Sequence, residues 1–296
     1  MLVLLLIQIA AAVTVFRPDT VAVNQAEDQP LLARSEAVSA VDQILVADEQ
    51  GKQIKLLRGG KHWVLPELDG LPADGKKVQA LLGALGEHNH GWPVAHTAAA
   101  RQRFQVADYL YQRQITLLTQ GEVRAKIFLG TSPTYRKVHA RNEQHDAIYS
   151  ISLNTFDVPA QSDAWLDSAL LQTRTPVQIT ADGYSLDRSG GQWRLGTGEE
   201  PDSRELEALL GALRSLQVAG IAGKGTQQEL AQTEAELILR ISSLAGEVTL
   251  QLFKLGEEYF VLSSEYSRLF QLSAYDFDRL TGIDAFLLSG DNAVSP

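Results

Sequence analysis

The stretch LPADGKKVQALLGALGEH (residues 71–88) returns in altered form as EEPDSRELEALLGALRSL (residues 199–216). Both contain LLGAL, at residues 81–85 and 209–213, and both place apolar residues at positions i, i+3, i+4 and i+7. This spacing puts the apolar side chains on one face of an α-helix. The sequence therefore predicts the same amphipathic helix twice. Its apolar face consists of Val78, Leu81, Leu82 and Leu85 in one copy and of Leu206, Leu209, Leu210 and Leu213 in the other.

An aspartate precedes each predicted helix. Asp74 and Asp202 stand where an N-cap residue accepts a hydrogen bond from a free backbone amide, which contributes about 1 kcal/mol. In the second copy Glu205 follows Asp202 at the spacing of a capping box.

The similarity extends to both sides of the helix. Upstream, IKLLRGGKHWVL (54–65) matches YSLDRSGGQWRL (184–195), so that Trp63 corresponds to Trp193 across a glycine-containing turn. Alternating apolar positions on either side of such a turn predict a β-hairpin. The blocks matched downstream are GEVRAKIFLG (121–130) with GEVTLQLFKLG (246–256), Tyr135 with Tyr259, and IYSISLNTFD (148–157) with LFQLSAYDFD (269–278).

The numbering offset between aligned residues falls along the chain, from 130 to 128, 125, 124 and 121. Each change lies in a predicted loop, where changes in length are tolerated best. The alignment therefore predicts a tandem duplication, with copies of about 115 and 110 residues, the size of small domains.

Each copy is predicted to be an α+β unit with a mainly antiparallel sheet and one principal amphipathic helix. Runs of strands with a single main helix do not form the parallel sheet of a doubly wound fold. The later strands are predicted near residues 114–119, 123–129, 135–140 and 147–152 in the first copy, and near 236–241, 248–253, 259–263 and 268–272 in the second. The predicted order is a transmembrane anchor (1–17), a tether (18–40), repeat unit 1 (41–160), a connector with a short helix (161–175), repeat unit 2 (176–288) and a tail (289–296).

The composition excludes several classes of function. Hydrophobic residues make up 45% of the chain and charged residues 21%, which is the profile of a folded globular protein. A net charge of −10 argues against nucleic acid as a partner, because phosphate binding needs a concentrated basic surface. The chain has no cysteine, which excludes disulfides, zinc–thiolate sites, iron–sulfur clusters, thiol nucleophiles and a lipoprotein anchor.

The first residues, MLVLLLIQIAAAVTVF (1–16), are almost entirely apolar. As a helix they span roughly 24 Å, which is short of the ~30 Å hydrocarbon core. No Lys or Arg precedes them, so the basic leader that sets orientation is missing. Three interpretations are open: an uncleaved signal-anchor whose start lies upstream, a cleaved signal peptide, or a buried helix of a soluble fold. We favour the signal-anchor.

Four features together identify a family: the apolar N-terminus, GGKHWVLPELDGLPADGKKVQALLGAL, GEVRAKIFLG and IYSISLNTFDVPAQSDAWLDSALL. On these features the chain resembles the bacterial domain-of-unknown-function family 4340 over about residues 41–288. Genes of that family typically lie beside a gliding-motility-type (Gld-like) ABC transporter, with an ATPase, a permease and a GldG-like extracytoplasmic subunit. The resemblance implies a single-pass inner-membrane anchor, a periplasmic body and an auxiliary role with those subunits as partners. No catalytic residue is established for the family, so the resemblance implies none.

The best candidate for a metal site is EHNHGWPVAH (87–96), with His88, His90 and His96. A zinc site needs three or four converging ligands, and histidines at i and i+2 share a face of a strand but not of a helix. The ordinary interpretation is a solvated helix terminus, where histidines complement the helix dipole. RSLQVAGIAG (214–223) stands at the same place in the second copy without a histidine, so the fold does not require these residues. We predict no bound metal and keep the three histidines as candidate contacts for a partner or ligand.

A second candidate segment, YRKVHARNEQHD (135–146), concentrates positive charge. Its ordinary interpretation is a solvated sheet face, or an edge strand that its charges protect from aggregation. The second copy has the more apolar YFVLSSEYS (259–267) here, a face suited to packing on the other unit or on a partner. On a strand, four residues of the first segment share one face and are candidate contacts for an anionic ligand or partner: Tyr135, Lys137, His139 and Arg141.

No catalytic motif accompanies these residues. SGG (189–191) lacks the frame of a nucleophile elbow, and GKGTQQ (223–228) lacks the glycine spacing of a phosphate loop. The sequence therefore predicts a non-enzymatic, cofactor-free auxiliary or scaffold subunit. The alternative is a periplasmic ligand-binding module with a site between the two repeat units. A metal-dependent hydrolase is the least favoured hypothesis.

Overall fold

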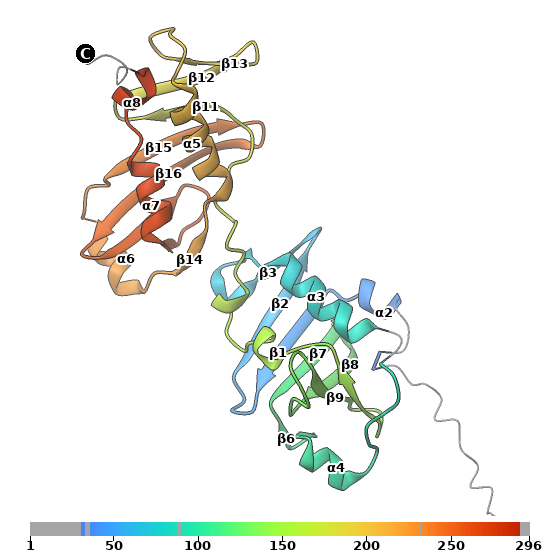
Figure 1. Cartoon of the computed structure of the whole chain (residues 1–296). Coiled ribbons are helices and arrows are strands. Elements are labelled where there is room, and N and C mark those ends of the chain that lie inside the picture. The colour runs from blue at the N-terminus through green and yellow to red at the C-terminus, as the bar shows by residue number, and fades with distance from the viewer. Residues whose placement is uncertain (1–30, 33–35, 88–89, 231, 291–296) are drawn as a thin grey trace, which may run out of the picture. The chain divides into compact units, whose positions relative to one another are not determined.

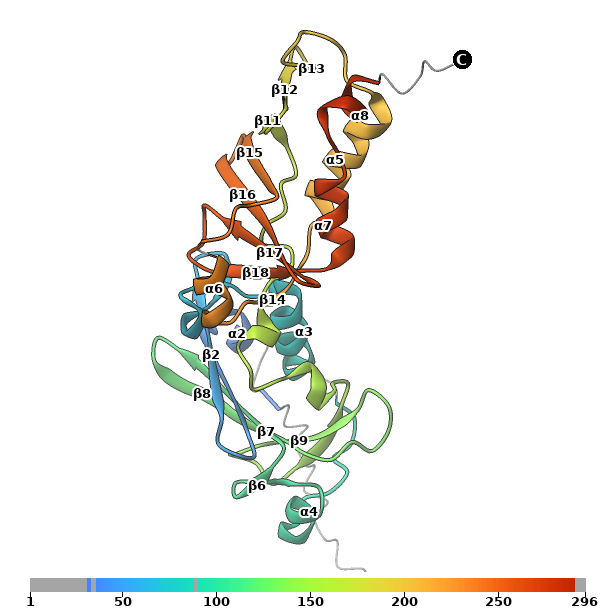
Figure 2. The ribbon, with the colours of Figure 1, turned by 90° about the vertical axis from the view of Figure 1, so that its left-hand side faces the viewer.

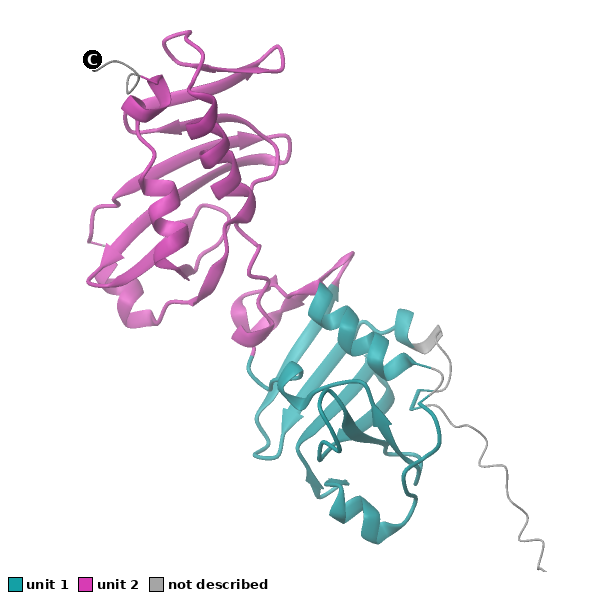
Figure 3. Cartoon of the chain, viewed as in Figure 1, with its two compact units in different colours: residues 1–58, 76–161 teal, residues 59–75, 162–296 magenta. Residues whose placement is uncertain are grey.

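The computed structural model describes residues 31–32, 36–87, 90–230 and 232–290. The whole predicted anchor and most of the tether and tail fall outside these residues. Of the tether, residues 31–32 and 36–40 are described, and Leu31 and Leu32 are buried. No described helix is long and apolar enough to cross a membrane. The chain forms two compact units, residues 1–58 with 76–161 and residues 59–75 with 162–296 (Figure 3).

The first of two eight-stranded antiparallel sheets has the strand order β10-β9-β8-β7-β1-β2-β3-β4 (Figure 1). A separate two-stranded sheet pairs β5 (Val106–Ala107) with β6 (Leu110–Tyr111). The strands of the large sheet are β1 (Gln43–Asp48), β2 (Gln53–Gly59), β3 (His62–Leu65), β4 (Leu71–Pro72), β7 (Arg113–Thr119), β8 (Glu122–Leu129), β9 (Val138–Asn142) and β10 (Ile148–Ile151).

The second sheet has the order β13-β12-β11-β15-β16-β17-β18-β14. Its strands are β11 (Pro176–Ala181), β12 (Tyr184–Ser189), β13 (Gln192–Leu195), β14 (Val218–Ile221), β15 (Leu237–Ser243), β16 (Gly246–Leu255), β17 (Glu258–Ser263) and β18 (Leu269–Leu272). In both sheets the first strand of an early meander, β1–β4 or β11–β13, pairs with the first strand of a later four-strand meander, β7–β10 or β15–β18. The predicted α+β class, with large antiparallel sheets and few helices, is confirmed.

Each predicted amphipathic helix buries its apolar face. The helix α3 (Gly75–Gly86) buries all four of its predicted residues. In α5 (Ser203–Ser215), Leu209 and Leu213 are fully buried, while Leu206 and Leu210 pack partly buried against the same core. Burying a leucine side chain contributes about 1.5–3 kcal/mol, so this face is a major source of stability for each sheet.

The predicted N-cap of α5 is confirmed. The Asp202 carboxylate accepts hydrogen bonds from the amides of Arg204 at 2.9 Å and Glu205 at 3.0 Å. The Asp202 amide donates to the carbonyl of Leu288 at 2.8 Å, so the predicted capping box with Glu205 is wrong. A neighbouring segment satisfies this amide in place of the glutamate.

Helices of the second unit lie on both faces of its sheet. Figure 2 shows α5 and α7 (Ala274–Thr281) on one face and α6 (Lys224–Leu230) on the other. Phe277 of α7 joins the main core, whereas Leu230 of α6 covers a second, smaller apolar cluster on the opposite face. A short C-terminal helix, α8 (Ala285–Ser289), completes the unit.

The outer face of the first sheet carries a corresponding cover. The helix α4 (Ala98–Arg103) and the β5–β6 ribbon pack there, where Ala100 and Val106 contact Phe128 and Ile148. The Thr97 side chain caps α4 by accepting a hydrogen bond from the Ala100 amide at 3.2 Å.

Within the second unit, residues 59–75 are bonded to the connector. The amide of Asp167 donates to the carbonyl of Pro72 at 3.0 Å, and that of Asp74 donates to Trp165 at 2.7 Å. The short 3₁₀ helix η3 (Asp163–Trp165) stands where the connector helix was predicted, and its tryptophan is fully buried.

The strands of the two four-strand meanders lie within three residues of their predicted positions. The predicted pairing of Tyr135 with Tyr259 is nevertheless wrong. Tyr259 faces Leu272 across β17 and β18, and Val138 faces Ile151 across β9 and β10. Since Ile151 and Leu272 are aligned in the sequence, the counterpart of Tyr259 is Val138.

This register changes which residues of β9 and β17 correspond. His139 takes the position of Phe260, and Arg141 takes that of Leu262. In the second unit, Phe260 belongs to the apolar cluster under α6, and Leu262 packs against that cluster. The two units therefore cover the same outer face with different chemistry.

Candidate functional site

The structure does not gather the three candidate histidines into a metal site. His88 lies outside the described residues, His96 is exposed, and His90 is half-buried with its ring 5.8 Å from that of Tyr149. Among the described residues, no group of three or more His, Cys, Asp or Glu side chains is placed to hold a metal ion. Trp92 of this loop is 88% exposed.

The second candidate set is also divided. Tyr135 and Lys137 are exposed in the loop before β9, whereas His139 and Arg141 are buried within the strand, at 6% and 1% exposed. The interpretation of this segment as a solvated sheet face is therefore wrong for the two buried residues. The cover formed by α4, β5 and β6 removes them from water.

Arg141 joins the sheet to that cover. Its Nε donates to the carbonyl of Val106 at 2.8 Å, and its Nη2 forms an ion pair with Asp108. The guanidinium lies 5.0 Å from the centre of the Phe128 ring. Its Nη1 also approaches three carbonyl oxygens at 3.3 Å each, those of Asn142, Glu143 and His145. Because a buried guanidinium is costly unless its donors are satisfied, this network indicates a structural clamp.

His139 stacks inside the same cover. Its ring lies 4.1 Å from that of Phe104, and its Nδ1 is 3.0 Å from the Thr131 hydroxyl. Burial lowers the pKa of His139 below 6.5; a hydrogen bond with Thr131 opposes this shift, and the charge of Arg103 adds to it. The neutral imidazole is therefore the form that this site accommodates.

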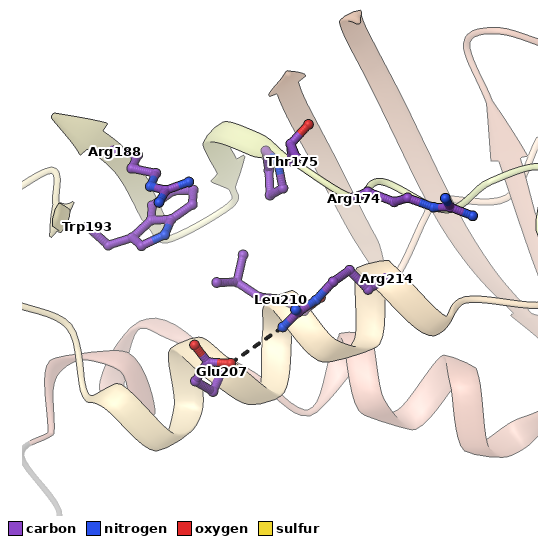
Figure 4. Close-up of a pocket in the computed structure, with 8 residues that line it drawn as sticks. Arg174, Thr175, Arg188, Trp193, Glu207, Leu210 and Arg214 are labelled. Atoms are coloured by element: carbon purple, nitrogen blue, oxygen red, sulfur yellow. Dashed lines mark hydrogen bonds and ion pairs between the residues drawn. The ribbon is translucent and has the colours of Figure 1, made fainter. Parts of the chain in front are cut away.

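A groove in the second unit brings together charged side chains that the sequence analysis did not select. It has a volume of about 260 Å³ and lies between the β12–β13 hairpin, the start of β11 and α5. Figure 4 shows Arg188 beside the Trp193 indole on one wall and Arg214 beside Glu207 on another, with Leu210 between them. The remaining lining residues are Arg174, Thr175 and Pro176.

The elements around this groove hold its walls in place. Arg188 and Trp193 are directly opposite each other in the hairpin, so their side chains share one face. Arg214 donates to the Glu207 carboxylate at 3.5 Å, and both side chains are more than half exposed. An ion pair this exposed contributes little stability, so Arg214 is available to another anion.

A smaller pocket of about 210 Å³ lies in the first unit. Its polar lining consists of Arg124, Asn142, Gln144 and His145, and Leu32 and Leu117 are among its apolar residues. The Asn142 side-chain amide donates to the carbonyl of Leu31 at 2.7 Å, which holds residues 31–32 at this pocket.

The sequence held one signal for the arginine groove. The alignment pairs Arg58 with Arg188 and Trp63 with Trp193, which repeats an arginine opposite a tryptophan in both hairpins. Trp63 packs in the core, where it is 7% exposed. Trp193 is only partly buried, so it does not share the packing role of Trp63.

Two large antiparallel sheets with few helices place the chain in the α+β class of proteins. The chain matches the family described as Domain of unknown function (DUF4340) over residues 63–236, which is more than half of its length. The chain belongs to that family. No curated protein and no solved structure matches it.

Replacing Arg141 by Ala is expected to lower the free energy of unfolding by about 3 kcal/mol, because several carbonyls and Asp108 lose a buried donor. Urea denaturation followed by circular dichroism measures this change. Arg124→Ala is the matched control, since Arg124 is exposed. A loss for Arg141→Ala no larger than that for the control would contradict the clamp.

His139 is expected to make the protein sensitive to acid. The folded state has the lower His139 pKa, so below about pH 6.5 the unfolded state binds more protons and stability falls as the pH decreases toward the folded-state pKa. His139→Phe, which introduces the residue found at the corresponding position of the second unit, is expected to reduce this slope. The urea midpoint measured at several pH values tests it, with exposed His96→Phe as control; an unchanged slope in His139→Phe would contradict the assignment.

Proposed function

We propose that the chain is a membrane-anchored extracytoplasmic auxiliary or scaffold subunit, associated with a gliding-motility-type ABC transporter and built from two tandem homologous α+β units. The family resemblance supports the choice of transporter. The exposed side chain of Phe156 is the observation that carries the scaffold role.

The corresponding strand orders support duplication. Aligned residues occupy equivalent positions in the two sheets: Leu56 faces Ile44, and Leu186 faces Ile179. All four of these side chains are fully buried. Each hairpin is followed by the leucine-rich helix that the repeat predicted, α3 in one unit and α5 in the other.

Phe156 marks the place where the copies differ in exposure. The alignment pairs it with Phe277, which α7 buries to 3% exposed in the second unit. In the first unit only the short 3₁₀ helix η2 (Thr155–Asp157) stands there, and Phe156 is 84% exposed. Trp92 and Tyr135 of the same unit are 88% and 81% exposed. Exposed aromatic residues are the usual anchors of protein–protein interfaces, which supports a partner-binding role for this unit.

The proposed location is the inner membrane, with the apolar residues 1–17 as anchor and the two units in the periplasm. The composition is compatible with this location, because a chain without cysteine cannot form incorrect disulfides there. The alternative function is ligand binding, and the arginine groove of the second unit is the feature that favours it.

The absence of cysteine gives a clean test of location. A cysteine introduced at exposed Gln217 is expected to react with a membrane-impermeant maleimide once the outer membrane alone is permeabilised. Leu209→Cys is the buried control and is expected to react only after denaturation, since Leu209 is fully buried. Labelling of Gln217→Cys only after lysis of the inner membrane would contradict the periplasmic location.

Affinity purification of the tagged full-length chain from detergent-solubilised membranes tests the partner. The ATPase and permease subunits are expected to be recovered with the wild type, and Phe156→Ser is expected to reduce their yield at least fivefold, since interface aromatic anchors contribute about 1–2 kcal/mol or more. Leu244→Ser is the control, because Leu244 is 86% exposed in a turn of the second unit.

The outcomes of this purification separate two claims. Recovery of neither subunit after cross-linking would contradict the association with the transporter. Equal recovery with wild type, Phe156→Ser and the control would contradict the assignment of Phe156 to the interface.

A further inference from the structure

The arginine groove has a closed counterpart in the β2–β3 hairpin of the first sheet. Arg58, which aligns with Arg188, donates through Nη1 to the carbonyls of Ser39 at 2.7 Å and Val41 at 3.4 Å. Trp63, which aligns with Trp193, is buried. In the hairpin of the first sheet, the arginine is therefore bonded to backbone carbonyls and the tryptophan is buried.

The second unit leaves the same pair open. Among the described residues, Arg188 and Arg174 form no ion pair with an acidic side chain, and both are exposed. Trp193 is only partly buried, although it stands on the core-facing side of the hairpin. An exposed arginine and an indole on one rigid face form a ready surface for a planar anion.

The opposite wall carries a charge specific to the second unit. Arg214 stands at the end of the leucine-rich helix, where the first unit has Gly86. A Cβ on Gly86 would lie 2.7 Å from the Val38 side chain, so a larger residue there would require Val38 to shift. In the groove, Arg188 lacks the backbone hydrogen bonds that Arg58 makes, and Arg214 stands where the first copy has a glycine.

The charge balance of the groove is opposite to that of the whole protein. Three arginines and one glutamate line it, in a chain with a net charge of −10. Glu207 forms an exposed ion pair with Arg214 at 3.5 Å. The other two arginines have no acidic partner in the groove, so the net charge of its lining is positive. Guanidinium groups bind carboxylate and phosphate oxygens in a bidentate manner, so the groove matches an anionic group.

The apolar lining and the volume narrow the class of ligand further. The apolar part of the groove lining consists of Trp193, Leu210 and Pro176. Its volume of about 260 Å³ is below the ~300–1,000 Å³ of pockets that bury drug-sized ligands. We infer that this groove binds a small organic anion, with a carboxylate or phosphate held by Arg188 and Arg214 and a flat apolar part against Trp193.

Fluorine NMR of the full-length chain labelled with 5-fluorotryptophan tests this inference. The protein has four tryptophans, and Trp193→Phe identifies the resonance of the groove. The probes are phenyl phosphate and phenylpropionate, with inorganic phosphate and benzyl alcohol to test each half of the ligand alone. At concentrations up to about 10 mM, at least one aromatic anion is expected to shift the Trp193 resonance saturably. Trp92, which is 88% exposed, reports non-specific binding and is expected not to titrate.

Variants then assign the anion contact. Arg188→Ala and Arg214→Ala are each expected to weaken binding about tenfold. Arg240→Ala removes the same charge from an exposed position outside the groove and is expected to bind like the wild type. Unchanged resonances of buried Trp63 and Trp165 confirm that each variant is folded.

Four results would overturn the inference. The first two are the lack of a saturable shift with either aromatic anion, and groove variants that bind like the wild type. The other two are binding of benzyl alcohol as tight as that of the aromatic anions, and binding of inorganic phosphate as tight as that of phenyl phosphate. All of them concern the second unit alone, so none bears on the association with a transporter.

Discussion

Burial of one leucine-rich helix face against an antiparallel sheet is the interaction on which each unit depends. In the second unit Leu209 and Leu213 are fully buried against a sheet whose inner positions include Ile179 and Leu186, also fully buried. An antiparallel sheet that keeps one face partly in water needs such a cover on its other face. The hairpin that precedes each helix and the meander that follows it are both placed by this contact.

The opposite face of each sheet shows how one position can be filled in different ways. Phe260 and Leu262 meet α6 through apolar contacts in the second unit. His139 and Arg141 occupy the corresponding positions in the first, where an ion pair and several carbonyl oxygens replace apolar contacts. The polar solution costs desolvation, which is offset only when the guanidinium donors are satisfied. The partners of Arg141 explain why positive charge on this strand is not a surface feature.

The sequence was sufficient for the features that depend on local pattern. Helical spacing located α3 and α5, alternation and glycine turns located both hairpins, and the repeat located the strands of both meanders. The sequence was not sufficient for register or for burial on the outer face, because both depend on segments distant in the chain. Arg141 is the clearest example, since the residues that bury it come from the α4–β6 cover. The arginine groove was not predictable for a related reason: aligned residues do not share one role, since Arg58 is bonded to backbone carbonyls and Arg188 lines a groove.

The two units share one core contact and differ at their surfaces. In the first unit Phe156 is exposed because η2 replaces the longer α7. In the second unit Arg188 lines an open groove, whereas its counterpart Arg58 is held by the carbonyls of the chain before β1. Both differences lie outside the shared helix–sheet contact.

The most direct test of this account is native-state hydrogen exchange of Leu209→Ala. If the helix face supports the whole second sheet, losing a fully buried leucine costs about 2–5 kcal/mol. The amides of β11, β15, β16 and β17 are then expected to exchange at least about thirtyfold faster, together with those of α5. Faster exchange confined to α5, with unchanged protection in the four strands, would contradict the claim that the sheet depends on this helix.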